Sequence, residues 1–204
     1  GILFDELLAL YRGFELETPA IHYKDYIFFQ RSFLRSGQLD LQMKYWSHVF
    51  PHERAIPVLD LPLDFPRPPA FTFEGDSYHF QLSGKGAADL KKFCQEQDVT
   101  LFMLLSTGLT LLLNYYTNNS NIVIGCGVSG RNHADLHRIP GMFVNALPIN
   151  HQIEPGDTIT GFLSKVKTTS LSALEHRDVP FEYLVEQLAP PRDPSRHPLF
   201  DVSL

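Results

Sequence analysis

Apolar positions in the first fifty residues recur every three to four residues, which is the spacing of an amphipathic helix. This spacing predicts three helices, over residues 2 to about 13, 23–34 and about 39–50. In the third helix, Tyr45 and Trp46 are expected to point inward. Because each apolar stripe needs a surface to cover it, the three helices are predicted to pack as a cluster.

A proline-rich stretch, residues 56–69, interrupts this pattern with five prolines in fourteen residues. Proline removes a backbone donor and favours extended geometry in the residue before it, so neither a helix nor a central strand is expected there. Several large apolar side chains in the same stretch exclude a freely solvated linker. We therefore predict an ordered crossing segment here, which is the best candidate for a boundary between two lobes.

Strand-like and helix-like stretches alternate after this boundary, and the alternation predicts an α/β layered lobe. Strands are predicted over residues 77–82, 122–125, 142–149 and 199–204. Helices are predicted over residues 84 to about 97, 101–116, 159 to about 174 and 180 to about 188. Ser83 and Thr100 are expected to cap two of these helices, and Thr158 and Pro180 to begin the other two.

Composition narrows the classes of function. Of the 204 residues, 44% are hydrophobic and 20% are charged, which is typical of a soluble globular protein. The net charge of −6 argues against a nucleic-acid partner bound through its phosphates. Cys94 and Cys126 lack CxxC spacing, so we expect no disulfide scaffold and no zinc site. Both are predicted to be buried thiols in a reducing, cytoplasmic compartment.

The longest apolar run, residues 101–116, is interrupted by polar side chains. It is shorter than the ~20 apolar residues of a membrane span, which favours a buried core helix and no membrane partner. The chain begins inside a helical pattern, without an initiator Met or a basic leader. We therefore expect it to be part of a longer protein.

Two motifs in the middle of the chain resemble functional signatures only in part. The run Gly125-Cys-Gly-Val-Ser-Gly130 matches GxGxxG, but residues 131–140 lack the helical periodicity that a dinucleotide site requires. We favour glycines that allow a close approach of another backbone or a ligand. Ser129 lies outside a GxSxG elbow, which argues against a hydrolase. His133 and His137 have the spacing of metal ligands on a helix but lack a third ligand, which favours a solvated loop.

Asn145 is a polar residue inside an apolar run, residues 142–147. A buried amide requires partners, so Asn145 either holds the backbone or faces a cavity that a ligand enters, and we favour the structural role. The run His176-Arg-Asp-Val-Pro-Phe-Glu182 is typical of a junction between two helices. Arg192, Asp193 and Arg196 are expected to form charge-assisted bonds that fix a loop.

Five short motifs occur in one order along the chain. They are Tyr23-Lys-Asp25-Tyr26, Tyr45-Trp46 with the later run 59–68, Gly141-Met-Phe-Val-Asn145, His176-Arg-Asp178-Val-Pro-Phe-Glu182 and Arg192-Asp193-Pro-Ser-Arg196-His-Pro-Leu199. Together they resemble the condensation domain of a bacterial non-ribosomal peptide synthetase. Ala146 stands where that family usually has Thr, and His197 where Asn is common. The Phe-Val-Asn form favours an ordinary condensation domain over its epimerisation and heterocyclisation relatives.

This resemblance implies a V-shaped domain of two lobes, each similar to chloramphenicol acetyltransferase, around a tunnel. Peptidyl and aminoacyl carrier proteins dock at its two mouths and deliver thioesters on phosphopantetheine arms. The amine of one substrate then attacks the thioester of the other, which forms an amide. By the same resemblance, residues 1–68 are the tail of the N-terminal lobe, and residues 69–204 are most of the C-terminal lobe, truncated at its end.

The resemblance also implies roles for single residues. Asn145 is expected to face the tunnel as part of its floor, and Gly127, Ser129 and Arg131 are expected to lie near the pantetheine path. Seven other motif residues are expected to be structural: Tyr23, Asp25, His176, Asp178, Arg192, Asp193 and Arg196. We expect no metal site and no cofactor bound by the chain itself.

The HHxxxDG motif that carries this family's chemistry does not occur in the chain. We therefore expect no catalytic residue in it and no amide formation by this chain alone. Two alternatives stay open. One is a non-catalytic module that docks carrier proteins or adjacent synthetase domains, and the other is a relative that acts as a coenzyme A-dependent acyltransferase. The latter needs a histidine supplied elsewhere and a coenzyme A site that the sequence does not show.

Overall fold

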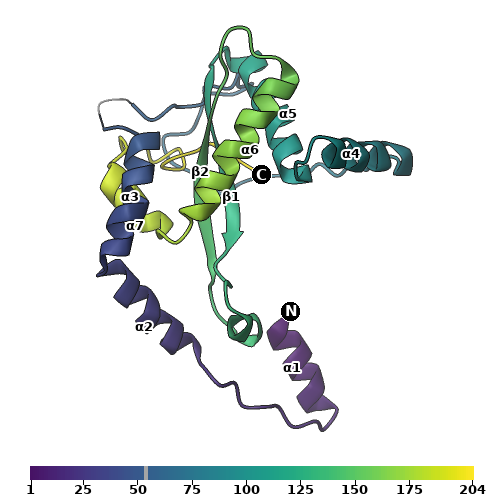
Figure 1. The fold of residues 1–204 in the computed structure, drawn as a ribbon, viewed down its shortest axis with the longest axis vertical. Coiled ribbons are helices and arrows are strands. Elements are labelled where there is room, and N and C mark those ends of the chain that lie inside the picture. The colour runs from purple at the N-terminus through teal and green to yellow at the C-terminus, as the bar shows by residue number, and fades with distance from the viewer. Residues whose placement is uncertain (53–54) are drawn as a thin grey trace.

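The computed structural model describes residues 1–52 and 55–204, and Figure 1 shows their arrangement. Three helices precede the proline-rich segment: α1 (Ile2–Tyr11), α2 (Tyr23–Leu34) and α3 (Gly37–Val49). All three are confirmed as helices, but their predicted packing as one cluster is wrong, because α1 buries none of its residues. The chain leaves α1 through Gly13, whose φ of +80° lies in the left-handed region that favours glycine.

The second part of the chain alternates helices and strands, as predicted. It contains α4 (Gly84–Glu96), α5 (Leu101–Thr117), β1 (Asn121–Ser129), the 3₁₀ helix η1 (Ala134–Arg138), β2 (Val144–Gln152), α6 (Ile159–Glu175), α7 (Phe181–Leu188) and β3 (Val202–Ser203). The hydroxyls of Ser83, Thr100 and Thr158 each accept a hydrogen bond from the backbone N–H three residues later, at 3.1–3.2 Å. These caps satisfy N–H groups that the first turn of a helix leaves unpaired.

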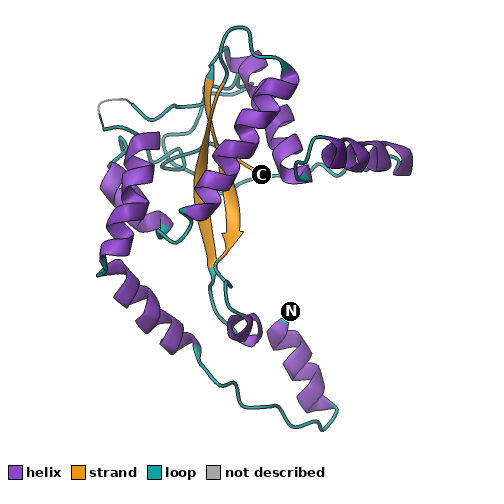
Figure 2. Ribbon diagram, in the orientation of Figure 1, coloured by secondary structure: helices purple, strands orange, loops and turns teal. Residues whose placement is uncertain are grey.

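A mixed sheet of order β2-β1-β3 forms the centre of the second part. β1 and β2 are antiparallel, with Asn121 opposite Gln152 and Ser129 opposite Val144, whereas β3 pairs with β1 in parallel. Figure 2 shows the two long strands side by side, with α6 lying along them and α5 beside them. The fold is therefore mixed α/β, with helices packed on a small sheet.

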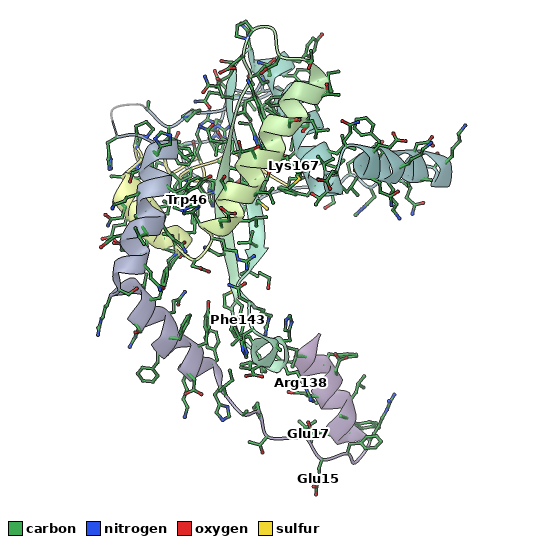
Figure 3. All side chains as sticks on the ribbon, viewed as in Figure 1. Glu15, Glu17, Trp46, Arg138, Phe143 and Lys167 are labelled. Atoms are coloured by element: carbon green, nitrogen blue, oxygen red, sulfur yellow. The ribbon has the colours of Figure 1, made fainter. Side chains whose placement is uncertain are left out.

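The main core joins the helices before the proline-rich segment to this sheet. Trp46 of α3 is fully buried and packs in one cluster with Leu147 and Ile149 of β2 and with Leu184 of α7. Figure 3 shows Trp46 on the side of α3 that faces the strands. Burial of such large apolar side chains stabilises each by about 1.5–3 kcal/mol, so α3 is held firmly against the sheet.

The strand predicted over residues 77–82 is wrong. Alternating apolar residues in this segment follow an extended path without strand pairing, and Tyr78 and Phe80 remain 89% and 74% exposed. Alternation makes one face apolar, but a strand forms only when a neighbour accepts and donates its backbone hydrogen bonds. Among the residues that the structure describes, none pairs with this segment. The strand predicted over residues 199–204 is also shorter than expected, since only Val202–Ser203 pair with β1.

The proline-rich segment is extended and attached to the C-terminal residues. The backbone N–H of Leu59 donates to the Asp201 carboxylate at 3.1 Å, and the Leu59 carbonyl accepts from the Arg196 guanidinium at 2.9 Å. No single helix of the described ranges is long and apolar enough to cross a membrane. Helices α4 and α5 together have the length and composition of a membrane span, but the chain bends by 102° between them.

Candidate functional site

A groove of about 790 Å³ lies between α2–α3 and the adjoining ends of β1 and β2. Tyr26, Phe29 and Phe33 of α2 form one wall, and Val128 and Phe143 contribute to the opposite wall. Phe29 is 69% exposed although it is apolar, because it faces this open space. The groove is thus walled largely by apolar side chains, as is usual for sites that bind small molecules.

Polar side chains in the groove come from several segments of the chain. Gln42 comes from α3, Asn132 from the loop after β1 and Asn145 from β2. Asp178 belongs to the turn between α6 and α7, residues 176–180, and Glu182 to the first turn of α7. A few polar groups in an apolar groove are what orients a bound ligand.

Tyr23, Tyr26 and Phe143 form an aromatic clasp that attaches α2 to the loop before β2. The rings of Tyr23 and Tyr26 lie 5.2 and 4.7 Å from the ring of Phe143, measured between centroids. The Tyr23 hydroxyl donates to the Met142 carbonyl at 2.9 Å, and its ring fills the space that a Cβ on Gly141 would need. Figure 3 shows Phe143 at this end of the strands. Two of the sequence motifs therefore meet here, 119 residues apart at the Tyr23–Met142 bond.

Asp25 lies in the first turn of α2 and also lines the groove. Its carboxylate accepts a hydrogen bond from the His22 N–H at 2.8 Å, which closes a capping box. Burial raises the pKa of the Tyr26 phenol, and Tyr23 and Asp178 add to the rise. The phenol is therefore protonated at neutral pH and available as a hydrogen-bond donor in the groove.

Asn145 holds the turn between α6 and α7. Its Nδ2 donates to the carbonyls of Arg177 and Val179 at 2.9 and 2.7 Å. Its Oδ1 accepts from the Phe181 N–H at 2.9 Å. Asn145 also lines the groove, but three of its four hydrogen-bonding positions are used on backbone groups. The side chain thus shapes the floor of the groove through the backbone it fixes.

His176 begins this turn and packs against α3. Its ring stacks on Tyr45 at a centroid distance of 4.1 Å, and its carbonyl accepts from Trp46 Nε1 at 2.9 Å. Its Nδ1 lies 2.8 Å from the Ser172 carbonyl, which requires a proton on Nδ1. Burial raises the pKa of Tyr45 to about 12, with Glu175 adding to the rise. Through these contacts His176 packs against α3.

Asp178 joins three segments at the wall of the groove. Its carboxylate accepts from Gln42 Nε2 at 3.1 Å and from Asn132 Nδ2 at 3.4 Å. Its own N–H donates back to Gln42 Oε1 at 3.1 Å. Neither Gln42 nor Asn132 lies in a distinctive sequence pattern, so neither was expected at this site.

Of the three residues expected near the pantetheine path, one lines the groove and two do not. Ser129 lines the groove, whereas Gly127 and Arg131 do not. Gly127 is exposed, with no side chain close to it. Arg131 donates to the carbonyls of Leu136 and Ile139, the latter at 2.9 Å, and its guanidinium lies over the Phe143 ring. Its charge is therefore used to hold the loop after β1.

The glycine run allows close packing and does not form a dinucleotide site. A Cβ on Gly125 would overlap the ring of Phe200, and one on Gly130 would come within 2.7 Å of the Phe143 carbonyl oxygen. Gly130 opens no α-helix, and β1 pairs with an antiparallel partner. His133 and His137 lie on exposed turns of the η1 region. No cluster of three possible metal ligands occurs within residues 1–52 and 55–204.

Arg196 connects the C-terminal motif to the proline-rich segment. It donates to the Leu59 carbonyl and to Asp201, both at 2.9 Å. Asp193 accepts from the hydroxyl and the N–H of Ser195 at 2.6 and 2.8 Å, and these bonds lower the pKa of Asp193. Arg192 is exposed. This motif therefore fixes a loop at a distance from the groove.

A buried polar pair was missed by sequence analysis. Ser106 of α5 and His151 of β2 are 0% and 2% exposed, and Ser106 Oγ lies 3.0 Å from His151 Nε2. Burial lowers the pKa of His151 to about 4, so the ring is neutral at pH 7. The pair lies between a helix and the sheet and does not line the groove, which favours a structural role. Its one signal was a histidine at the end of a strand that is apolar at most of its central positions.

The fold is mixed α/β, and its groove lies where α2–α3 meet the small sheet. Comparison with known families matches residues 1–204 to the family described as Condensation domain, and the chain belongs to that family. It is 42% identical to tyrocidine synthase 3 of Brevibacillus parabrevis over 201 residues, which are 98% of this chain and 3% of that protein. It is 39% identical to bacitracin synthase 3 of Bacillus licheniformis, again over 98% of this chain and 3% of that protein.

Two solved structures share the fold. The X-domain from teicoplanin biosynthesis matches with a TM-score of 0.84 and 25% identity, over 96% of this chain and 44% of that one. The four-domain nonribosomal peptide synthetase holo-AB3403 matches with a TM-score of 0.77 and 30% identity, over 82% of this chain and 13% of that one. The chain thus spans less than half the length of each of these relatives, and about 3% of the two synthases.

Proposed function

We propose that this chain is part of a condensation domain that joins two carrier-protein-bound thioesters, one aminoacyl and one peptidyl or aminoacyl, by an amide bond. The observation that carries the proposal is the match of all 204 residues to the Condensation family, which includes peptide antibiotic synthetases. The groove supports it, because residues of three shared motifs line its walls: Tyr26, Asn145 and Asp178. The carriers, their phosphopantetheine arms and the adjacent synthetase domains are the partners we propose.

In the proposed reaction, the amine nitrogen of one substrate attacks the thioester carbonyl of the other. A C–N bond forms, the C–S bond breaks, the pantetheine thiol leaves and the amine loses a proton. Holding two tethered reactants in contact can supply about 7–11 kcal/mol of the barrier reduction. HHxxxDG does not occur in this chain, so we assign it the holding of substrates and not the handling of the proton.

We propose that the groove follows the junction between residues 1–68 and 69–204. The α2–α3 wall belongs to the first range, and the walls from β1, β2 and the turn at residues 176–180 belong to the second. Asn145 shapes the floor, and Ser129 offers a hydroxyl to the arm. Gly127 and Arg131 lie outside the groove, which argues against contact with the arm, and Arg131 instead holds the loop after β1.

The test is a titration of the isotope-labelled chain with a phosphopantetheinylated carrier protein, followed by NMR. We expect the NMR signals of Phe29, Ser129 and Val144 to change their chemical shifts. The same carrier without its phosphopantetheine arm should not produce these changes. Identical titrations with both carriers, or no binding of either, would overturn the proposed groove. We expect no amide product from the chain alone, and turnover above a heat-inactivated control would contradict that part.

A non-catalytic docking module is the second candidate. It is favoured by the combination of a formed groove with the lack of HHxxxDG in these residues. The two candidates separate when the chain is assayed within the synthetase that contains it, with both carriers loaded. A dipeptide product that disappears when the groove is blocked supports condensation, whereas binding with no product in that setting supports the module.

A further inference from the structure

The carboxamide of Gln42 makes a two-way contact with a single residue. Its Nε2 donates to the Asp178 carboxylate and its Oε1 accepts from the Asp178 N–H, both at 3.1 Å. A planar amide that donates and accepts at the same partner fixes both the position and the rotation of that partner. Asp178 is therefore oriented by α3, although 136 residues separate it from Gln42.

The contact continues across the groove wall. The second carboxylate oxygen of Asp178 accepts from Asn132 in the loop after β1, at 3.4 Å. Gln42, Asp178 and Asn132 all line the groove. One carboxylate thus connects α3, the turn between α6 and α7, and the loop after β1.

The α2–α3 wall is attached to the sheet side at two places. One is the aromatic clasp, where Tyr23 and Tyr26 meet Phe143. The other is the contact of α3 with the turn, made by Gln42 and, one helical turn later, by Trp46. Because the groove lies between these attachments, its width depends on both of them.

We propose that Gln42 is a positioning residue for the groove. Through Asp178 it holds the turn and the loop after β1 at the spacing at which the groove receives a pantetheine arm. Burial of Trp46 stabilises the contact between α3 and the turn at residues 176–180, whereas Gln42 orients Asp178 within that contact. This inference rests on the proposed function of the groove and names a residue that acts on the ligand through another.

The decisive variant is Gln42→Glu, which keeps the size of the side chain and removes the donor. Two carboxylate oxygens then face each other, and like charges at this distance repel. The double variant Gln42→Glu with Asp178→Asn reverses the polarity of the pair. The new amide nitrogen at position 178 donates to the new carboxylate at position 42, and its amide oxygen still accepts from Asn132. Gln95→Glu on the exposed surface of α4 is the matched control.

Two readouts are followed for each variant. Trp46 is the single tryptophan of the chain, so acrylamide quenching of its fluorescence reports on the contact between α3 and the turn. Affinity for a phosphopantetheinylated carrier protein reports on the groove. We expect Gln42→Glu to expose Trp46 and to weaken binding by about tenfold, the effect of losing a hydrogen bond to a charged group. The double variant is expected to recover both readouts, and Gln95→Glu to change neither.

The outcomes distinguish this inference from the proposed function. The positioning role is overturned if Gln42→Glu changes neither the affinity for the carrier protein nor the shielding of Trp46 from acrylamide. It is also overturned if the double variant recovers neither readout. Exposure of Trp46 with unchanged affinity also overturns it, because Gln42 is then only structural. Failure of the unsubstituted chain to bind the carrier refutes the proposed function of the groove, and with it the role of Gln42 toward an arm. In that case, acrylamide quenching of Trp46 fluorescence is the readout that tests whether Gln42 holds the turn.

Discussion

Tyr23 and Gly141 are in direct contact across one end of the groove: the tyrosine ring occupies the space that a Cβ on the glycine would need. Gly141→Ala is therefore expected to push the ring away and to weaken its hydrogen bond to Met142. Overpacking of this kind costs about 1–3 kcal/mol of the free energy of unfolding. Chemical denaturation measures it. Gly108→Ala in α5 is the control, since a Cβ there meets nothing within 4 Å and is expected to be neutral or stabilising.

Stability is expected to fall as the pH is lowered from about 6.5 to about 4, because of His151. Its pKa is lowered by burial from 6.5 to about 4 in the folded chain. Between these values the unfolded chain binds a proton that the folded chain does not, so acid favours unfolding. The full shift corresponds to about 3 kcal/mol. His197, whose pKa burial also lowers, acts in the same direction.

Denaturation series at several pH values check this prediction. The double variant His151→Leu with Ser106→Ala removes the buried pair without leaving an unpaired hydroxyl, and its stability is expected to vary less over the same range. A titration of the His151 ring by NMR with a midpoint near 6.5 would contradict the account.

Asn145→Ala is expected to destabilise the chain by about 1–3 kcal/mol, because the carbonyls of Arg177 and Val179 lose their shared donor. Hydrogen exchange of the Phe181 amide should accelerate, since it loses its acceptor. Val144→Ala is the neighbouring control, because Val144 is 64% exposed. Equal effects of the two substitutions would argue against the role assigned to the amide.

Arg196→Ala is expected to release the proline-rich segment from the C-terminal motif. The guanidinium donates to Leu59 and Asp201 with only 15% of its side chain exposed, so its loss costs about 2–3 kcal/mol. Limited proteolysis should then cut within residues 56–69 faster than in the unsubstituted chain. The exposed Arg192 offers a comparison, and Arg192→Ala should leave both the cleavage rate and the stability nearly unchanged.

Local patterns were sufficient for the helices and their caps. Ser83, Thr100 and Thr158 stand before apolar runs with helical spacing, and a cap requires only residues within one turn. The same reasoning failed at residues 77–82, because alternation specifies which face is apolar and not which strand will pair with it. The groove could not be predicted for a related reason: the bonds of Gln42 and Asn132 to Asp178, and of Asn145 to the turn, join segments 32 to 136 residues apart.

The sequence by itself determined the helices and the family, since spacing, composition and short motifs are local properties. Only the tertiary structure decided that the Asn145 amide bonds to backbone groups, that Arg131 holds a loop, and that Gln42 contacts Asp178. The physical reason is that an amide or guanidinium can bond to many groups, and its local sequence does not select among them. Which one it takes depends on segments as much as 136 residues away, brought together by burial of a common core.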